Sequence, residues 1–120
     1  MANAVVVKIE GLGQLLAACA KADTEVQTRA ARALLASALR IETEAKQRCP
    51  VDTGRLRSSI RSDVDETKLE GQVWTNVKYA PFVEFGTSKQ HAQPYMTPAA
   101  ELERPKIIAA LEQLINGLGI

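Results

Sequence analysis

Cysteine, histidine and aromatic residues are all scarce in this chain of 120 residues. Two cysteines and a single histidine cannot build the usual Cys/His zinc site from one copy, and two thiols, Cys19 and Cys49, indicate reduced and mostly buried residues rather than a disulfide framework. Aromatic residues make up 4% of the chain, too few for a platform that stacks the bases of single-stranded nucleic acid. A net charge of +1 lacks the cationic surplus of a protein that coats DNA, although a local basic patch remains compatible with it.

Long hydrophobic runs are also missing. No apolar stretch approaches the roughly 20 residues of a membrane helix, and the first residues carry no basic stretch followed by an apolar run. We therefore expect no membrane partner, no signal peptide and folding in a cytoplasm. With 46% hydrophobic and 24% charged residues, residues 1–120 are expected to form a single domain that needs neither a disulfide nor a metal.

The clearest periodic pattern predicts a long helix over about residues 24–48. Apolar and small residues recur there at steps of three and four, and Pro50 favours an end before it. Thr24 and Gln27 have capping-box spacing, which predicts the start. Before this helix, residues 4–10 are typical of a strand and residues 12–22 of a first helix.

The second half alternates short patterns. Asp52, Thr53 and Gly54 predict a turn, and residues 60–79 predict a β-hairpin turning at residues 69–71. Residues 80–85 fit a short helix or an extended apolar segment, and residues 86–94 predict a mobile loop. A C-terminal helix is expected over about residues 98–116, with Thr97 as its N-cap and Pro105 kinking or interrupting it.

Few residues suggest chemistry. Asp52-Thr53-Gly54 is the triplet of dimeric aspartic proteases, but Arg55 and Arg57 would keep that carboxylate ionised, and a turn is the favoured interpretation. Arg55, Arg57 and Arg61 form a basic cluster that is either a solvated face or a phosphate-facing patch. Apolar side chains crowd residues 79–85, which fits either a core or an interface.

Three segments in order resemble the small tail-component family of long-tailed double-stranded DNA phages of the Hong Kong 97 type. They are CPVDTGRLRSSI (residues 49–60), YAPFVEFGT (residues 79–87) and QPYMTPA (residues 93–99). The resemblance implies an α+β fold, with a small antiparallel β-sheet packed against a long α-helix and a C-terminal helix. It also implies a virion protein with no cofactor, no metal and no catalytic site.

The same resemblance implies a ring of identical subunits, such as a hexamer, at the head–tail junction. Its role there would be that of a neck, tail-completion or tail-terminator subunit. Its partners would be copies of itself, connector or head-closure proteins and tail-tube proteins, with genome DNA passing through the lumen without specific binding. We predict interface roles for seven residues: Arg55, Arg57, Glu84, Phe85, Lys89, His91 and Tyr95. The alternative function is a small nucleic-acid-binding module that uses Arg55, Arg57 and Arg61, together with Lys78.

Overall fold

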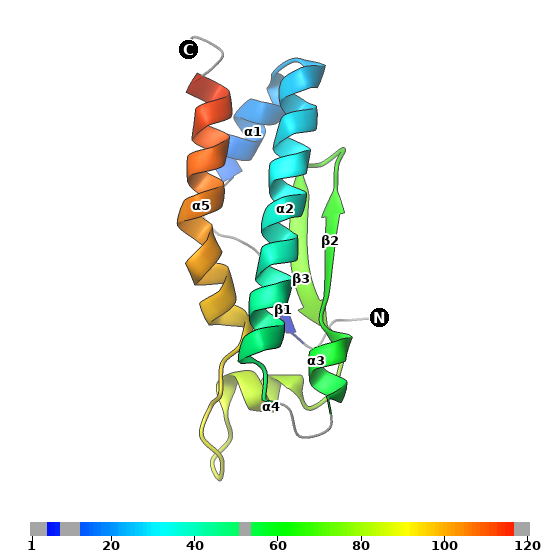
Figure 1. Ribbon diagram of the computed structural model, residues 1–120, viewed down its shortest axis with the longest axis vertical. Helices are drawn as coiled ribbons and strands as arrows, with labels where there is room; N and C mark the ends of the chain where they lie inside the picture. The colour runs from blue at the N-terminus through cyan, green and yellow to red at the C-terminus, as the bar shows by residue number, and fades with distance from the viewer. Residues whose placement is uncertain (1–4, 8–12, 51–53, 117–120) are drawn as a thin grey trace.

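The computed structural model describes residues 5–7, 13–50 and 54–116 and has the expected α+β architecture. Figure 1 shows its elements, which in chain order are β1 (Val5–Val7), α1 (Gly13–Lys21), α2 (Thr24–Arg48), α3 (Arg55–Ser59), β2 (Arg61–Asp65), β3 (Glu70–Thr75), α4 (Ala80–Phe85) and α5 (Met96–Asn116). Of the strand predicted over residues 4–10, β1 is the part within the described residues.

Helix α2 has the predicted bounds, but a different residue caps it. Asp23 is the N-cap, and its carboxylate accepts a hydrogen bond from the backbone N–H of Val26 at 3.0 Å. The predicted capping box of Thr24 and Gln27 is therefore wrong. The Gln27 side chain instead donates to the carbonyl oxygens of Ala20 and Ala22, which ties α2 to the end of α1.

The sheet has three antiparallel strands in the order β1-β3-β2. Val73 and Thr75 of β3 are buried on one face, while Trp74 lies between them in sequence and so points to the other face. Strands β2 and β3 are shorter than the two strands of the predicted hairpin. The turn between them ends before Glu70, earlier than the predicted residues 69–71, because Leu69 is buried and has a positive φ of 53°. At Gly71, a Cβ atom would lie 3.3 Å from the Leu34 side chain of α2, so glycine permits the close approach of helix and sheet.

Helix α2 forms the centre of the fold. It packs against α5 on one side and against β2 and β3 on the other (Figure 1). The buried stripe of α2 consists of small and aliphatic residues and serves both of these contacts: Val26, Ala30, Ala31, Leu34, Ala38, Ile41 and Ala45. The 25 residues of α2 span about 37 Å at a rise of about 1.5 Å per residue.

The molecule is elongated. Its principal extents are 54 × 25 × 20 Å, and its radius of gyration of 15.8 Å exceeds the roughly 13.6 Å of a compact domain of this length. Two buried clusters share this length. One joins the sheet, α3 and the start of α5, and the other joins α1, Leu69 and the second half of α5.

Helix α5 begins at Met96, two residues before the predicted start, and continues through Pro105 to Asn116. The predicted N-cap, Thr97, therefore lies inside the first turn. The expectation that Pro105 ends a first helical segment is also wrong. The physical reason for the early start is a contact with α4.

Candidate functional site

Helix α4 has an inward and an outward face within fewer than two turns. Ala80 and Glu84 are four residues apart and buried, whereas Phe82 and Phe85 are three residues apart and exposed to 55% and 69%. Tyr79, directly before the helix, is also exposed. Pro81 occupies the first turn, where its missing N–H group needs no partner. We call Tyr79, Phe82 and Phe85 the aromatic surface.

The inward face of α4 supplies the cap of α5. The Glu84 carboxylate is buried and accepts three backbone hydrogen bonds. Its Oε1 accepts from the N–H groups of Tyr95 at 3.0 Å and Met96 at 2.9 Å, and its Oε2 accepts from the N–H of Thr97 at 3.1 Å. The next residue, Pro98, has no N–H group. Glu84 therefore satisfies the free donors at the start of α5 and places a negative charge at the positive end of the helix dipole, since the first turn has no acidic residue of its own.

Titratable side chains packed beside Glu84 are held neutral. Burial first, and then the charge of Glu84, raise the pKa of the Tyr95 phenol, whose hydroxyl donates to the carbonyl oxygen of Ala80 at 3.4 Å. Burial also raises the pKa of the Cys49 thiol, against the opposing effect of the Arg57 guanidinium. The Tyr95 phenol and the Cys49 thiol therefore stay protonated, and neither is a source of a reactive phenolate or thiolate.

The segment between α4 and α5 projects from the end of the molecule (Figure 1). Residues 87–90 of the loop predicted for residues 86–94 form a hydrogen-bonded hairpin. The Thr87 N–H donates to the carbonyl of Gln90 at 2.9 Å, and the Gln93 N–H donates to the carbonyl of Val83 at 2.8 Å. Gly86 starts the hairpin with a φ of 77°, and a Cβ atom there would lie 2.8 Å from the Ala92 backbone nitrogen. We call residues 87–93 the finger.

The first of the three segments, residues 49–60, connects α2 to the sheet at the same end of the molecule. Gly54 precedes α3 with a φ of 76°, as the predicted turn requires, while Asp52 and Thr53 lie outside the described residues. Leu56 and Ile60 are buried, and the hydroxyls of Ser59 and Thr75 share a hydrogen bond of 2.6 Å that joins α3 to β3. The motif thus carries the chain from the long helix into the sheet.

The seven predicted interface residues divide into three groups. Arg55, Phe85, Lys89 and His91 are exposed at the α4 end and stay candidates. Arg57 is half-buried and its Nε is buried. Glu84 and Tyr95, which were also predicted as interface residues, are buried within their own chain, where the carboxylate caps α5 and the phenol packs beneath α4.

Sequence reasoning missed a second exposed apolar surface. Leu35 and Leu39 of α2 and Leu102 of α5 are all more than 40% exposed. An open groove of about 310 Å³ runs between the two helices and is lined by Leu39, Arg40, Thr43, Glu44, Gln47, Ala99, Leu102, Glu103 and Lys106. We call the groove with Leu35 at its side the α2/α5 groove. Leu35 and Leu39 lie four residues apart outside the buried stripe of α2, and that spacing is the signal that could have revealed it.

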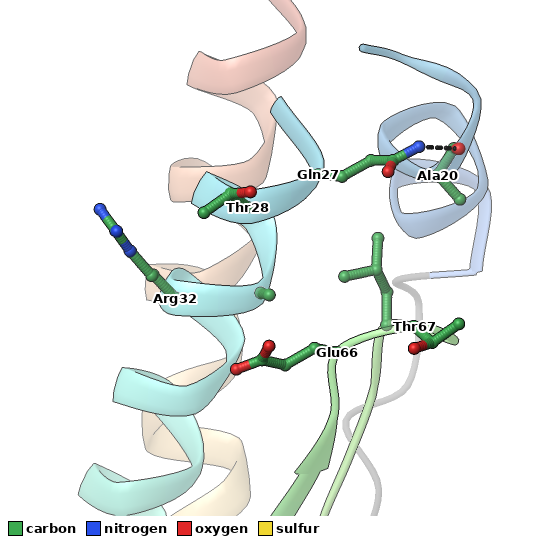
Figure 2. Close-up of a pocket in the computed structure, with 8 residues that line it drawn as sticks. Ala20, Gln27, Thr28, Arg32, Glu66 and Thr67 are labelled. Atoms are coloured by element: carbon green, nitrogen blue, oxygen red, sulfur yellow. Dashed lines mark hydrogen bonds between the residues drawn. The ribbon is translucent and has the colours of Figure 1, made fainter. Parts of the chain in front are cut away.

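A larger depression of about 470 Å³ lies at the opposite end, between α1, α2 and the β2–β3 turn. Figure 2 shows Gln27 reaching toward Ala20, Arg32 pointing away from them, and Glu66 and Thr67 on the turn. Its charged groups, Arg32 and Glu66, are exposed and do not converge on one point. In the described parts of the chain, no group of three or more His, Cys, Asp or Glu side chains could hold a metal ion.

Comparison of the sequence with protein families finds a family of bacteriophage tail components. Residues 13–86, more than half of the chain, match the family described as "Bacteriophage HK97-gp10, putative tail-component". The chain belongs to this HK97 gp10-like family of phage tail components. Comparisons with curated proteins and with solved structures gave no match. No helix among the described residues is long and apolar enough to cross a membrane.

The matched region contains the first of the three segments, residues 49–60, and the second, residues 79–87, up to Gly86. The third segment, residues 93–99, lies outside it. The structure nevertheless joins the third motif to the second, because Glu84 of one caps the helix that begins in the other. The three segments are therefore one structural unit at one end of the molecule.

Proposed function

We propose that this phage tail component forms a ring of identical subunits at the head–tail junction, as a neck, tail-completion or tail-terminator protein. In this proposal it contacts itself, connector or head-closure proteins and tail-tube proteins. It is assembled in the bacterial host cytoplasm and becomes part of the virion. The observation that carries the proposal is the exposed aromatic surface on a chain of this family. The hydrogen bonds of Glu84 to the start of α5 fix the helix that bears this surface.

The aromatic surface lies within the size range of the largest apolar patch on a typical monomer. If a fully exposed ring presents about 200 Å², the exposed fractions of Tyr79, Phe82 and Phe85 amount to roughly 300 Å². Apolar patches of about 300–600 Å² are the largest on typical monomers and are commonly functional. Tyr and Phe are also enriched in the buried cores of protein interfaces.

A ring further requires two unlike surfaces, because each subunit meets its two neighbours through different faces. The chain has such a pair: the aromatic surface at one end and the α2/α5 groove on its flank. A net charge of +1 is compatible with a lumen through which DNA passes without tight binding.

Native mass spectrometry of the purified chain over a range of concentrations, with and without tail tubes, tests the proposal. We expect an oligomer of one defined size that binds tail tubes, seen as rings by electron microscopy. A chain that stays monomeric at every concentration and ignores tail tubes contradicts the proposal.

Binding of nucleic acid is the second candidate, because Arg55 and Arg61 are exposed near the α4 end. The half-buried Arg57 weakens this patch, since its Nε faces the protein interior. Contacts from three cations to phosphates would give a log–log salt slope near −2.7, at about 0.9 per phosphate. We expect no such slope in duplex DNA titrations, and a steep slope that Arg55→Ala and Arg61→Ala flatten would favour DNA binding.

The proposal assigns the chain no catalytic role, no cofactor and no metal. Wild-type protein and the Asp52→Asn variant should both leave peptide substrates intact. Peptide cleavage that disappears in Asp52→Asn would show that the protein is a protease and would overturn this assignment.

A further inference from the structure

The exposed large hydrophobic side chains of the described residues fall into two groups of three. Tyr79, Phe82 and Phe85 form the aromatic surface. Leu39 and Leu102 line the α2/α5 groove, and Leu35 lies one helical turn before Leu39 on α2. The aromatic surface lies on and just before a short helix at the end of the molecule, and the groove lies along its flank. The two groups are both apolar and differ in position.

A single chain does not bring these surfaces together. Phe85 is 69% exposed and Leu102 is 47% exposed in the same molecule. Helix α4 lies beyond the C-terminal end of α2 (Figure 1). Its aromatic residues are exposed while Ala80 and Glu84 are buried. Neither group covers the other within one chain, so a cover for them would come from another molecule.

We propose that the aromatic surface of one copy inserts into the α2/α5 groove of a second copy. The inference rests on the ring proposed above and names the contact that builds it. A contact between two different surfaces of the same chain leaves each copy with one donor and one acceptor surface. Repetition of that contact generates a closed ring when the rotation per subunit closes.

The sizes of the two surfaces are compatible with this contact. The groove of about 310 Å³ is at the small end of pockets that hold an organic group, and it has room for an aromatic side chain. A standard interface buries about 800 Å² on each partner. The aromatic surface, at roughly 300 Å², is the apolar centre of such an area, and the neighbouring finger with Lys89 and His91 provides polar surface around it.

The formal charge of the groove lining is zero, and rigidity favours the contact. Arg40 and Lys106 stand against Glu44 and Glu103, and Glu103 is paired with both cations. The three hydrogen bonds to Glu84 fix α4 against α5 before any partner arrives. A preorganised surface loses less conformational entropy on binding.

Disulfide trapping tests the contact in the full-length chain. Phe85→Cys and Leu102→Cys proteins are mixed in equal amounts under mild oxidation, while the native thiols of Cys19 and Cys49 stay buried. We expect a covalent dimer in the mixture and in neither protein alone, because the two surfaces differ. A chain with both substitutions should give a ladder that ends at the size of the ring.

Gln113→Cys in place of Leu102→Cys is the matched control. Gln113 is exposed on the same helix, eleven residues and about 16 Å further along. Its yield with Phe85→Cys should be at least tenfold lower. In parallel, Leu39→Ser should weaken self-association at least tenfold and leave the melting temperature unchanged, whereas Gln113→Ser should change neither.

The outcomes separate the inference from the proposed function. If oligomers form, but position 85 links to position 102 no better than to position 113, the inference is wrong and the ring stands. If Leu39→Ser assembles as well as wild type, the groove is not the acceptor surface. If the wild-type chain never associates, the proposed ring fails and this contact fails with it.

Discussion

Replacing Glu84 by alanine removes the only acceptor that the structure shows for three backbone N–H groups at the start of α5. Two of these groups belong to fully buried residues, Tyr95 and Met96, where water does not replace the lost carboxylate. The third belongs to Thr97, which is exposed and can be solvated. The α4 helix and the finger would lose their main polar connection to α5.

The expected loss of stability is about 3–5 kcal/mol. A buried donor left without a partner costs about 1–3 kcal/mol, and a charged acceptor at a helix N-terminus adds up to about 2 kcal/mol. These contributions share one carboxylate, so they do not simply add. With an unfolding entropy of about 2.1 cal/mol/K per residue, 1 kcal/mol corresponds to about 4 °C here, and the melting temperature should fall by about 12–20 °C.

Urea unfolding monitored by circular dichroism measures this loss. Glu84→Gln keeps one acceptor oxygen without the charge and should lose about half as much. Glu112→Ala removes an exposed glutamate from the same helix and should change stability by less than about 0.5 kcal/mol. If Glu84→Ala is no more destabilising than Glu112→Ala, the capping argument is refuted.

Two further predictions concern the finger and the buried thiols. Gly86→Ala should destabilise the chain by about 2–3 kcal/mol, because the φ of 77° at Gly86 and its closeness to Ala92 exclude a side chain. Gly13→Ala is the control and should not destabilise the chain, since nothing lies within 4 Å of its Cβ position. Equal melting temperatures of the two variants would contradict this prediction. Burial raises the pKa of the Cys19 and Cys49 thiols above the ordinary value of 9.0, so the stability they contribute is present below that pH and lost as the pH rises through the folded-state pKa. The urea midpoint should therefore fall above about pH 9, and less so in Cys49→Ser; a constant midpoint up to about pH 11 would show that ionisation of these thiols is not coupled to unfolding.

The long helix was predictable because its determinants are local. The apolar stripe of α2 recurs at helical spacing over about five turns, from Val26 to Ala45, and Pro50 follows the end of the helix, so the predicted residues 24–48 coincide with the observed Thr24–Arg48. Its cap was mispredicted by one residue, since Asp23 and Thr24 are both good capping residues and only the backbone geometry selects between them.

The start of α5 and the role of Glu84 were not predictable in this way. Thr97 followed by Pro98 fits the local rules for a helix start. The helix begins at Met96 because a carboxylate from twelve and thirteen residues away satisfies its first two N–H groups. The same distant contact buries Glu84 and Tyr95, which composition alone places at the surface. Backbone hydrogen bonds fold residues 87–90, part of the predicted loop, into a hairpin.

The sequence by itself determined the elements, their order and the family, because periodicity, turn residues and ordered motifs are all properties of neighbouring residues. Only the tertiary structure decided which apolar side chains stay in solvent. Phe82 and Phe85 are exposed because Ala80 and Glu84 take the inward face of α4, and Leu39 and Leu102 are exposed because α2 and α5 meet through other faces. Exposure depends on which surfaces of the folded chain remain uncovered, and that is settled by contacts between residues far apart in the sequence.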